Sequence, residues 1–216
     1  MPTARESLLD AAFAALEGRP WPRVKMAEVA AAAGVSRQTL YNQFGSKEGL
    51  ARALVRREAD AYLSGVERAL SGASGAAGPR ERLAAAAVWT VRSATENPLV
   101  RAVLTGCWNE RLPTPVTSVT PVTSVTPVTS VTPVTSVTPV TSVTSVRTAS
   151  PGPLPAPGEL LGQARDRAVR LLAGDWPPGA VELPLACEAV ARLALSYVVA
   201  PAPAADVARM VRTVLA

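Results

Sequence analysis

The chain of 216 residues contains no histidine and only two cysteines, Cys107 and Cys187. The two cysteines lie far apart, and neither belongs to a closely spaced pair of metal ligands. We therefore expect no disulfide framework, no metal site and no cofactor. Without histidine, general acid–base chemistry would fall to scattered Asp and Glu residues, and the sequence has neither a glycine-rich phosphate loop nor a GxSxG nucleophile motif. These absences argue against an enzyme.

Long apolar runs are also missing. Arg192 interrupts the best candidate, so no segment reaches the roughly 18 uninterrupted apolar residues that a membrane span needs. The first residues include Arg5, Glu6 and Asp10, where a secretory signal peptide needs an apolar run. We therefore expect a cytoplasmic protein without a membrane partner. Because 48% of the residues are hydrophobic, the chain can still bury a core.

Positive charge is concentrated in the first quarter of the chain. Residues 1–57 hold nine Lys and Arg against five Asp and Glu, whereas residues 58–216 hold thirteen against twelve. A local basic excess suits contact with a polyanion, although a solvated charged face has the same composition. The charge pattern alone does not distinguish these two interpretations, so evidence for a polyanion contact has to come from a sequence motif.

The spacing of apolar residues predicts an all-α fold. Thr3 and Glu6 can form a capping box at the start of a first helix, and Gly34 separates a short second helix from a third that Ser36 caps. A fourth, longer helix starts at Ser46. No segment has the pattern of a folded strand.

The later helices follow the same periodicity. Apolar positions predict helices over residues 79–97, 99–112 and 159–172, with two more before the C-terminus. The segment 99–112 carries apolar residues on more than one face, which is typical of a helix surrounded by others.

The second and third predicted helices form a helix-turn-helix pattern around Gly34. Val29 and Leu40 can pack inward, which leaves a row of polar side chains on the outer face of the third helix. Arginine can bind guanine and glutamine can bind adenine through paired hydrogen bonds, and a threonine methyl can contact thymine. Ser36 and Tyr41 suit phosphates. Helix pairs with polar outer faces also occur in ordinary helical bundles.

The stretch MAEVAAAAGVSRQTLYNQFGSKEGLARAL, residues 26–54, resembles the DNA-binding signature of TetR-family transcriptional regulators. Its AGVS, its TLY triplet, the following aromatic residue and the lysine that opens the next helix carry the resemblance. The resemblance implies DNA contacts by Arg37, Gln38, Thr39, Tyr41, Asn42, Gln43 and Lys47. Ser36, whose hydroxyl suits a phosphate, completes the predicted set of DNA contacts.

The resemblance also implies an overall organisation. A helix-turn-helix DNA-binding domain at residues 1–46 would read a palindromic operator on double-stranded DNA. A helical domain at residues 47–216 would dimerise and bind a small effector that releases the DNA, as in a repressor. Lys25 departs from the family, which often has a threonine there to cap the second helix. The spelling SRQTLYNQFGSK is similar to regulators associated with alkane oxidation genes, which implies a fatty-acid-like, apolar effector.

The last two helices have broad apolar faces that suit a homodimer interface. A protomer that binds one half-site contacts too few base pairs for useful specificity. Helix-turn-helix proteins of this type therefore dimerise and bind two half-sites together. The alternative is that these faces cover the core of their own subunit. The predicted interface residues are Val190, Leu193, Tyr197, Val207, Met210, Val211 and Val214.

Few charges separate the apolar residues of the helices between residues 79 and 172. An apolar effector fits such a lining, although periodic leucine and valine also form ordinary cores. An architectural DNA-binding protein without effector control is the alternative function. The predicted effector pocket consists of Leu83, Trp89, Leu99, Val103, Leu104, Trp108 and Leu161.

The hexapeptide TPVTSV occurs five times in succession from Thr114 to Val143, and a related TSV follows. A proline at every sixth position removes backbone donors and restricts the preceding threonine, which excludes a helix. We predict a low-complexity linker over residues 114–146. A polyproline-like tether and an irregular strand are the alternatives.

Deleting residues 114–143 is expected to leave helical content, dimerisation and operator affinity unchanged, because the cost of closing a surface loop grows only logarithmically with its length. Circular dichroism and a DNA-binding titration of the deletion variant test this. Loss of folding or of DNA binding would show that the repeat is an integral part of the fold.

Overall fold

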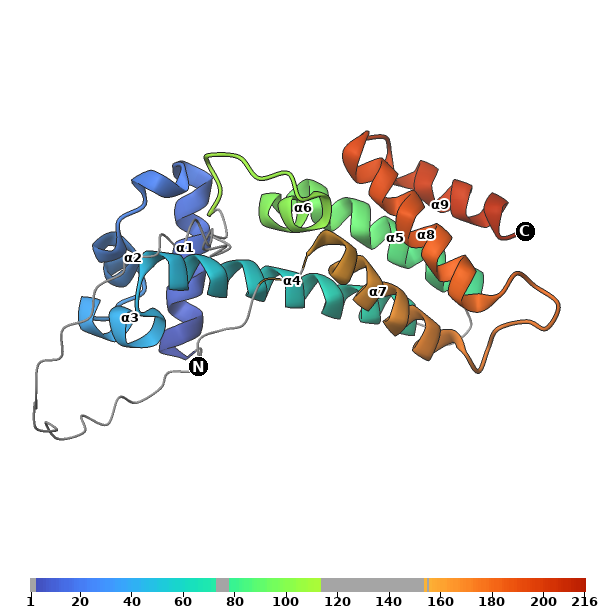
Figure 1. The fold of residues 1–216 in the computed structure, drawn as a ribbon, viewed down its shortest axis with the longest axis horizontal. Coiled ribbons are helices and arrows are strands. Elements are labelled where there is room, and N and C mark those ends of the chain that lie inside the picture. The colour runs from blue at the N-terminus through green and yellow to red at the C-terminus, as the bar shows by residue number, and fades with distance from the viewer. Residues whose placement is uncertain (1–2, 73–77, 114–153, 155) are drawn as a thin grey trace, which may run out of the picture.

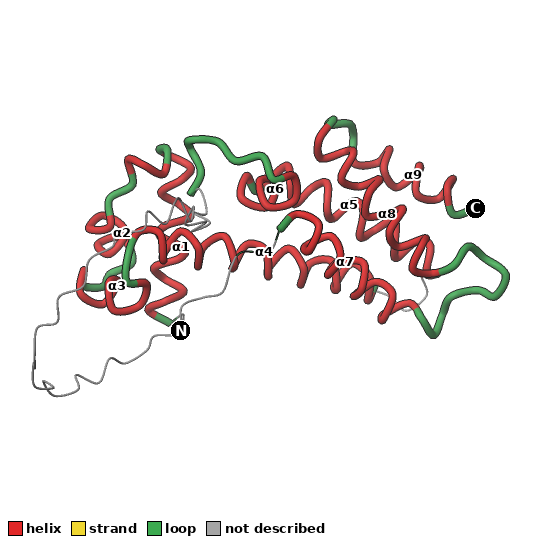
Figure 2. The backbone as a smooth tube through the Cα atoms, in the orientation of Figure 1, coloured by secondary structure: helices red, strands yellow, loops and turns green. Residues whose placement is uncertain are grey.

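The computed structural model describes residues 3–72, 78–113, 154 and 156–216, and within these ranges the fold consists of helices without strands (Figures 1 and 2). This confirms the predicted all-α class. The TPVTSV repeat and the predicted linker lie outside the described residues. The elements are α1 (Ala4–Gly18), the 3-10 helix η1 (Trp21–Arg23), α2 (Met26–Ala32), α3 (Arg37–Phe44), α4 (Lys47–Ser71), α5 (Pro79–Glu96), α6 (Pro98–Thr105), α7 (Pro157–Leu172), α8 (Leu183–Val199) and α9 (Ala204–Val214).

The long helix α4 joins two groups of helices (Figure 1). Helices α1, α2 and α3 pack together around its beginning, while α5 and α7 lie along its second half. Helix α5 in turn contacts α8 and α9, and α6 contacts α4, α5, α7 and α8. The predicted domain boundary between residues 46 and 47 falls at the start of α4 and stays a prediction. None of the described helices is both long and apolar enough to cross a membrane.

Polar side chains start several helices at the predicted places. The Glu6 backbone N–H donates to Thr3 Oγ1 at 3.2 Å, and the Thr3 N–H donates to Glu6 Oε2 at 2.7 Å, which completes a capping box. The bonds from Thr3 lower the pKa of Glu6. Ser46 Oγ accepts the N–H of Gly49 at 3.1 Å in the first turn of α4. Lys25 precedes α2 without a side-chain cap, because its ammonium cannot accept a hydrogen bond.

Helix α6 is shorter than predicted. The predicted helix at 99–112 ends at Thr105, where Gly106 adopts a left-handed φ of 71°. The Gly106 N–H donates to the carbonyl of Ala102 at 2.8 Å and closes the helix. In the loop that follows, Cys107 is exposed and Trp108 is half-buried against the core. The prediction was wrong because apolar loop residues that pack on the core mimic helical spacing.

Helices α4 and α5 approach closely at Gly65. A Cβ atom at this position would lie 2.1 Å from the ring of Trp89. The Trp89 Nε1–H donates to the carbonyl of Tyr62 at 3.1 Å, and the Tyr62 hydroxyl lies 3.2 Å from Thr90 Oγ1. Burial raises the pKa of Tyr62, and the bond to Thr90 opposes the shift. One glycine thus makes room for an indole that is hydrogen-bonded across the helix crossing.

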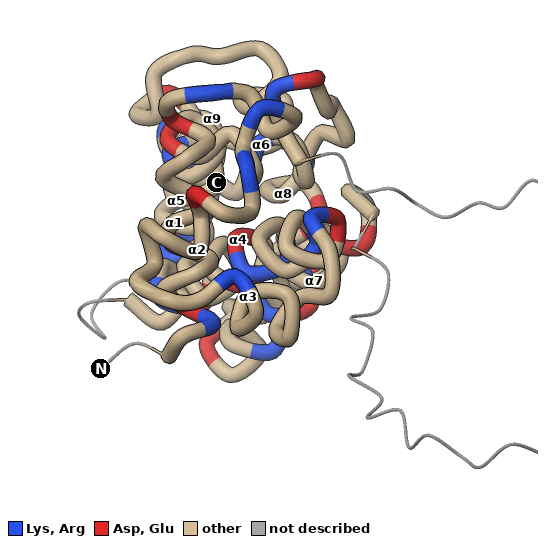
Figure 3. Tube along the Cα trace, turned by 90° about the vertical axis from the view of Figure 1, so that its left-hand side faces the viewer, with Lys and Arg blue, Asp and Glu red and all other residues tan. Residues whose placement is uncertain are grey.

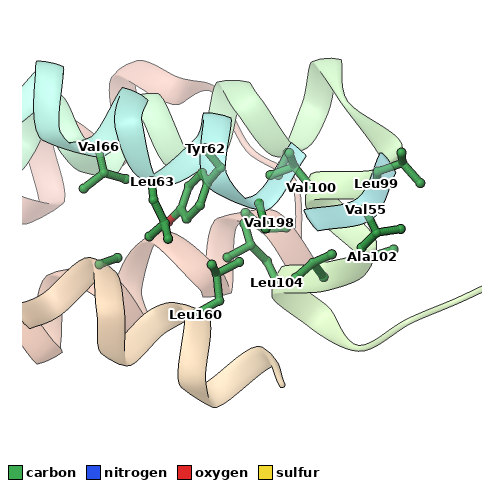
Figure 4. Packing of buried hydrophobic residues seen from close by; sticks show 14 of the residues in the cluster. Val55, Tyr62, Leu63, Val66, Leu99, Val100, Ala102, Leu104, Leu160 and Val198 are labelled. Carbon is green, nitrogen blue, oxygen red and sulfur yellow. The ribbon is translucent and has the colours of Figure 1, made fainter. Parts of the chain in front are cut away.

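The core is continuous from α4 to α8. Figure 4 shows buried side chains of α4, α6, α7 and α8 meeting around Tyr62. Among them, Leu104 of α6 and Leu160 of α7 have no exposed surface, and Val198 of α8 is 5% exposed. Burying a leucine side chain contributes about 1.5–3 kcal/mol. Packing at the centre therefore holds α6 and α7 to α4.

Replacing Gly65 with alanine is expected to destabilise the protein by about 1–3 kcal/mol, because the added methyl group overlaps the Trp89 ring. The free energy of unfolding in urea measures the effect. Gly162→Ala in α7 is the matched control, since a Cβ there meets no atom within 4 Å and alanine favours the helix by about 1 kcal/mol. Equal stabilities for the two variants would contradict the proposed packing.

Candidate nucleic-acid interface

Helices α2 and α3 form a helix-turn-helix around Gly34. Gly34 has a φ of 68°, which a residue with a side chain rarely adopts. The backbone N–H of Val35 donates to the Ala30 carbonyl at 3.0 Å and closes the turn. Ser36 then caps α3, because its Oγ accepts the backbone N–H of Thr39 at 3.0 Å. Leu40 has no exposed surface and fixes α3 on the domain core.

The polar face of α3 points to solvent. Among the described residues of the candidate interface, Gln38 and Asn42 are linked along the helix, with Gln38 Nε2 donating to Asn42 Oδ1 at 2.8 Å. Thr39 is half-buried beside the cap, and its Oγ1 lies 2.9 Å from Ser36 Oγ. The predicted contact residues that are exposed are Ser36, Arg37, Gln38, Tyr41, Asn42 and Gln43.

Lys47 lies differently from the other predicted contact residues. Its Nζ donates to the carbonyl of Pro22 at 3.1 Å and lies 5.4 Å from the ring centre of Trp21. Burial lowers the pKa of Lys47, and the charge of Glu48 opposes the shift. An ammonium has three donors, so the bond to Pro22 leaves two for other acceptors. The structure therefore holds this ammonium between η1 and the start of α4.

Arg5 is not among the DNA contacts predicted from the sequence. Its guanidinium carbon lies 4.7 Å from the ring centre of Phe44, at the end of α3. Arg23 and Lys25 are also exposed in the same group of helices. Figure 3 shows this end of the molecule facing the viewer, with Lys and Arg in blue. The basic excess over residues 1–57 was the signal for these residues, but charge counting does not tell which of them lie beside α3.

A narrow cavity lies among α4, α5, α7 and α8. Its volume is about 30 Å³, whereas pockets for organic ligands are about 300–1,000 Å³. Tyr62 and Thr90 supply hydroxyl groups, and Arg165 supplies a guanidinium that is bonded to Asp166 at 2.8 Å and Glu188 at 3.5 Å. The lining consists of Tyr62, Val66, Leu70, Leu83, Ala86, Ala87, Thr90, Ala164, Arg165, Ala168, Cys187, Val190, Ala191 and Ala194.

The predicted pocket residues are dispersed in the structure. Leu83 lines the cavity. Leu99, Val103 and Leu104 are buried on α6, and the half-buried residues Trp89, Trp108 and Leu161 pack against the core elsewhere. Alanines on facing helices form much of the cavity wall. The prediction from the sequence selected large apolar residues and therefore missed these alanines. Burial raises the pKa of Cys187, a further lining residue, to about 11, and nearby Arg165 opposes the shift.

The predicted dimer residues divide into three groups. Met210 and Val214 of α9 are 43% and 54% exposed. Leu193 and Tyr197 of α8 are half-buried. Val190, Val207 and Val211 are buried within the protomer, and Val190 lines the cavity. Sequence reasoning missed two exposed apolar residues of α8, Leu185 at 60% and Val199 at 63%.

Comparison with known proteins supports the helix-turn-helix assignment. Residues 8–54 match the bacterial regulatory proteins of the tetR family. The HTH-type transcriptional regulator AlkX of Mycobacterium tuberculosis is 46% identical over 66 residues, a match that spans 31% of this chain and 31% of that protein. The matched segment is therefore about a third of this relative's length.

Solved structures share the fold over nearly the whole chain. The TetR family repressor AlkX from Dietzia sp., implicated in biodegradation of n-alkanes, has a TM-score of 0.53 at 20% identity, covering 99% of this chain and 94% of its own. A TetR/AcrR family regulator from Thermobifida fusca has a TM-score of 0.57 at 16% identity, covering 98% and 95%. At these identities the likeness concerns the fold alone.

Together, the helix-turn-helix at one end and the helical body give the chain a two-part helical fold. Its segment 8–54 is similar to the tetR family of bacterial regulatory proteins, and the solved TetR-family structures share its fold.

Replacing Arg37 or Gln38 with alanine is expected to reduce affinity for a cognate DNA site by about 1–3 kcal/mol and to relax its sequence preference. Both residues are exposed on α3, so the thermal stability of each variant should stay close to that of the wild type. Footprinting and thermal unfolding measure the two effects. Unchanged footprints in both variants would rule out α3 as the reading helix.

Proposed function

We propose that this protein is a cytoplasmic transcriptional repressor that binds a palindromic operator through α3. The observation that carries the proposal is the exposed polar face of α3, which holds arginine and glutamine side chains suited to base edges. Ser36 and Tyr41 flank that face and suit phosphates. The match of residues 8–54 to the tetR family favours a regulator over an enzyme.

Footprinting on the DNA upstream of the protein's own coding region tests this function. A protected palindrome in that region is expected, with half-sites about one helical turn or a multiple apart. DNA of unrelated sequence is the control, and salt should weaken its binding strongly, because phosphate contacts dominate non-specific affinity. Equal binding to both DNAs without a footprint would favour the alternative of an architectural DNA-binding protein.

The proposed effector is a small apolar molecule that enters between α4, α5, α7 and α8. The lining is mostly alanine, valine and leucine, which supports an apolar ligand. The likeness to AlkX regulators favours a link with alkane oxidation genes. Because the cavity holds about 30 Å³, binding requires its walls to separate.

The proposed homodimer forms through α8 and α9. Exposed apolar side chains on both helices support this surface, since a second copy would bury them twice in a symmetric interface. Leu185, Val199, Met210 and Val214 are each more than 40% exposed. The buried predicted residues, such as Val211, stabilise the protomer whether or not the dimer forms.

Val214→Asp is expected to give folded monomers with weakened operator binding, because the charge is repeated on both sides of a symmetric interface. Sedimentation and circular dichroism separate assembly from folding. Val211→Asp is the contrasting variant, since Val211 has no exposed surface and a charge there should unfold the protomer. A Val214→Asp protein that stays dimeric would contradict this interface.

A further inference from the structure

A buried carboxylate lies between the two groups of helices. Glu58 of α4 is only 8% exposed. Its Oε1 accepts the Nε–H of Arg57 at 2.9 Å, and its Oε2 accepts from Nδ2 of Asn97 at 2.7 Å. An ionised carboxylate without such partners would be costly to bury. The position of Glu58 therefore depends on both neighbours.

Asn97 joins this carboxylate to the start of α6. While its Nδ2 donates to Glu58, its Oδ1 accepts the backbone N–H groups of Leu99 at 2.9 Å and Val100 at 3.3 Å. These N–H groups belong to the first turn of α6 and have no partner within the helix. A single side-chain amide thus caps α6 and binds α4, and both roles require the same orientation of the amide.

Arg57 extends the connection to α1. Its Nη1 donates to Asp10 Oδ1 at 2.5 Å, while Nε and Nη2 face Glu58. The planar guanidinium can hold two carboxylates in fixed directions. Asp10 belongs to α1, which packs against α2, α3 and α4. Hydrogen bonds therefore run from α1 through α4 to the first turn of α6.

The far end of α6 is also connected to the first group of helices. In the loop that follows α6, the carbonyl of Arg111 accepts the backbone N–H of Trp21 at 2.8 Å. The ring of Trp21 lies beside the ammonium of Lys47, a predicted DNA contact. Helix α6 is thus joined to the first group of helices at both ends, and at its first turn the bond between Asn97 and Glu58 is partly buried.

We propose that Glu58 and Asn97 are positioning residues for operator binding, which fix α1, and with it α2 and α3, relative to α6. This role rests on the proposed function. The two side chains touch no DNA. They act through Arg57 and Asp10 on the orientation of the helix-turn-helix, which must match the spacing of two half-sites in the dimer.

Asn97→Asp separates this role from helix capping. Aspartate caps a helix as well as asparagine does, but its second oxygen replaces the amide donor and places a like charge beside Glu58. We expect affinity for the footprinted upstream fragment to fall about tenfold. A loss of this size lies within the range of interaction energies between neighbouring residues that share a hydrogen-bond network. Affinity for unrelated DNA should change less than twofold, because phosphate contacts do not require the orientation of paired half-sites.

The double variant Glu58→Gln/Asn97→Asp supplies the rescue. The glutamine amide can donate to the new carboxylate while its oxygen faces Arg57, so the contact is restored with its polarity reversed. We expect affinity for the fragment to return to within about twofold of the wild type, a non-additive result. Val100→Ala is the structural control, because it removes buried side-chain volume from the first turn of α6 and leaves the backbone N–H that Asn97 accepts in place.

The outcomes are distinct. Loss of affinity in Asn97→Asp, rescue in the double variant and retention in Val100→Ala support the positioning role. Wild-type affinity in Asn97→Asp, a double variant no better than the single one, or an equal loss in Val100→Ala overturns it. A wild-type protein without a footprint overturns the proposed function itself. If Asn97→Asp does not fold, Asn97→Ser takes its place, since serine caps α6 but is too short to reach Glu58.

Discussion

Helix α4 must pack closely against both groups of helices, and two glycines allow it to do so. At Gly49 a Cβ would lie 1.9 Å from the carbonyl oxygen of Phe44, at the end of α3. At Gly65 it would lie 2.1 Å from the ring of Trp89 in α5. A helix of 25 residues spans about 38 Å, so the two contacts lie in different halves of the molecule. The relative placement of the two groups therefore depends on the straightness of one helix.

The orientation of α3 follows from this constraint. Only Gly45 and Ser46 separate α3 from α4, and Gly45 has a φ of 70° that turns the chain sharply. Ser46 then caps α4 through the N–H of Gly49. Because the turn is short and the contact at Gly49 is tight, α3 has little freedom to rotate about α4. In addition, Arg57 binds Asp10 of α1 and Glu58 binds Asn97 at the start of α6, so these hydrogen bonds help to fix α4 relative to α1 and α6.

Local sequence signals predicted the helix starts and the turn of the helix-turn-helix well. Caps such as Thr3 and Ser36 act within one turn of the chain, so neighbouring residues determine them. The end of α6 and the engagement of Lys47 depend on residues distant in sequence. Leu112 is buried and thereby extends an apolar pattern past Gly106, while Lys47 binds the carbonyl of Pro22, 25 positions away. Periodicity carries no information about such contacts.

The cavity was the least predictable feature, because facing alanines create it by leaving space. Opening it for an organic effector means separating α7 and α8 from α4 and α5, or α4 from α5. The α4–α5 crossing holds the Trp89 indole over Gly65. Helix α7 is joined to its neighbours by Arg167 with Glu67 at 2.7 Å, and just beyond its end Asp175 meets Arg82 at 2.7 Å. Leu160 and Leu172 of α7 also have no exposed surface, so opening the side of the cavity formed by α7 breaks buried apolar packing as well as these ion pairs.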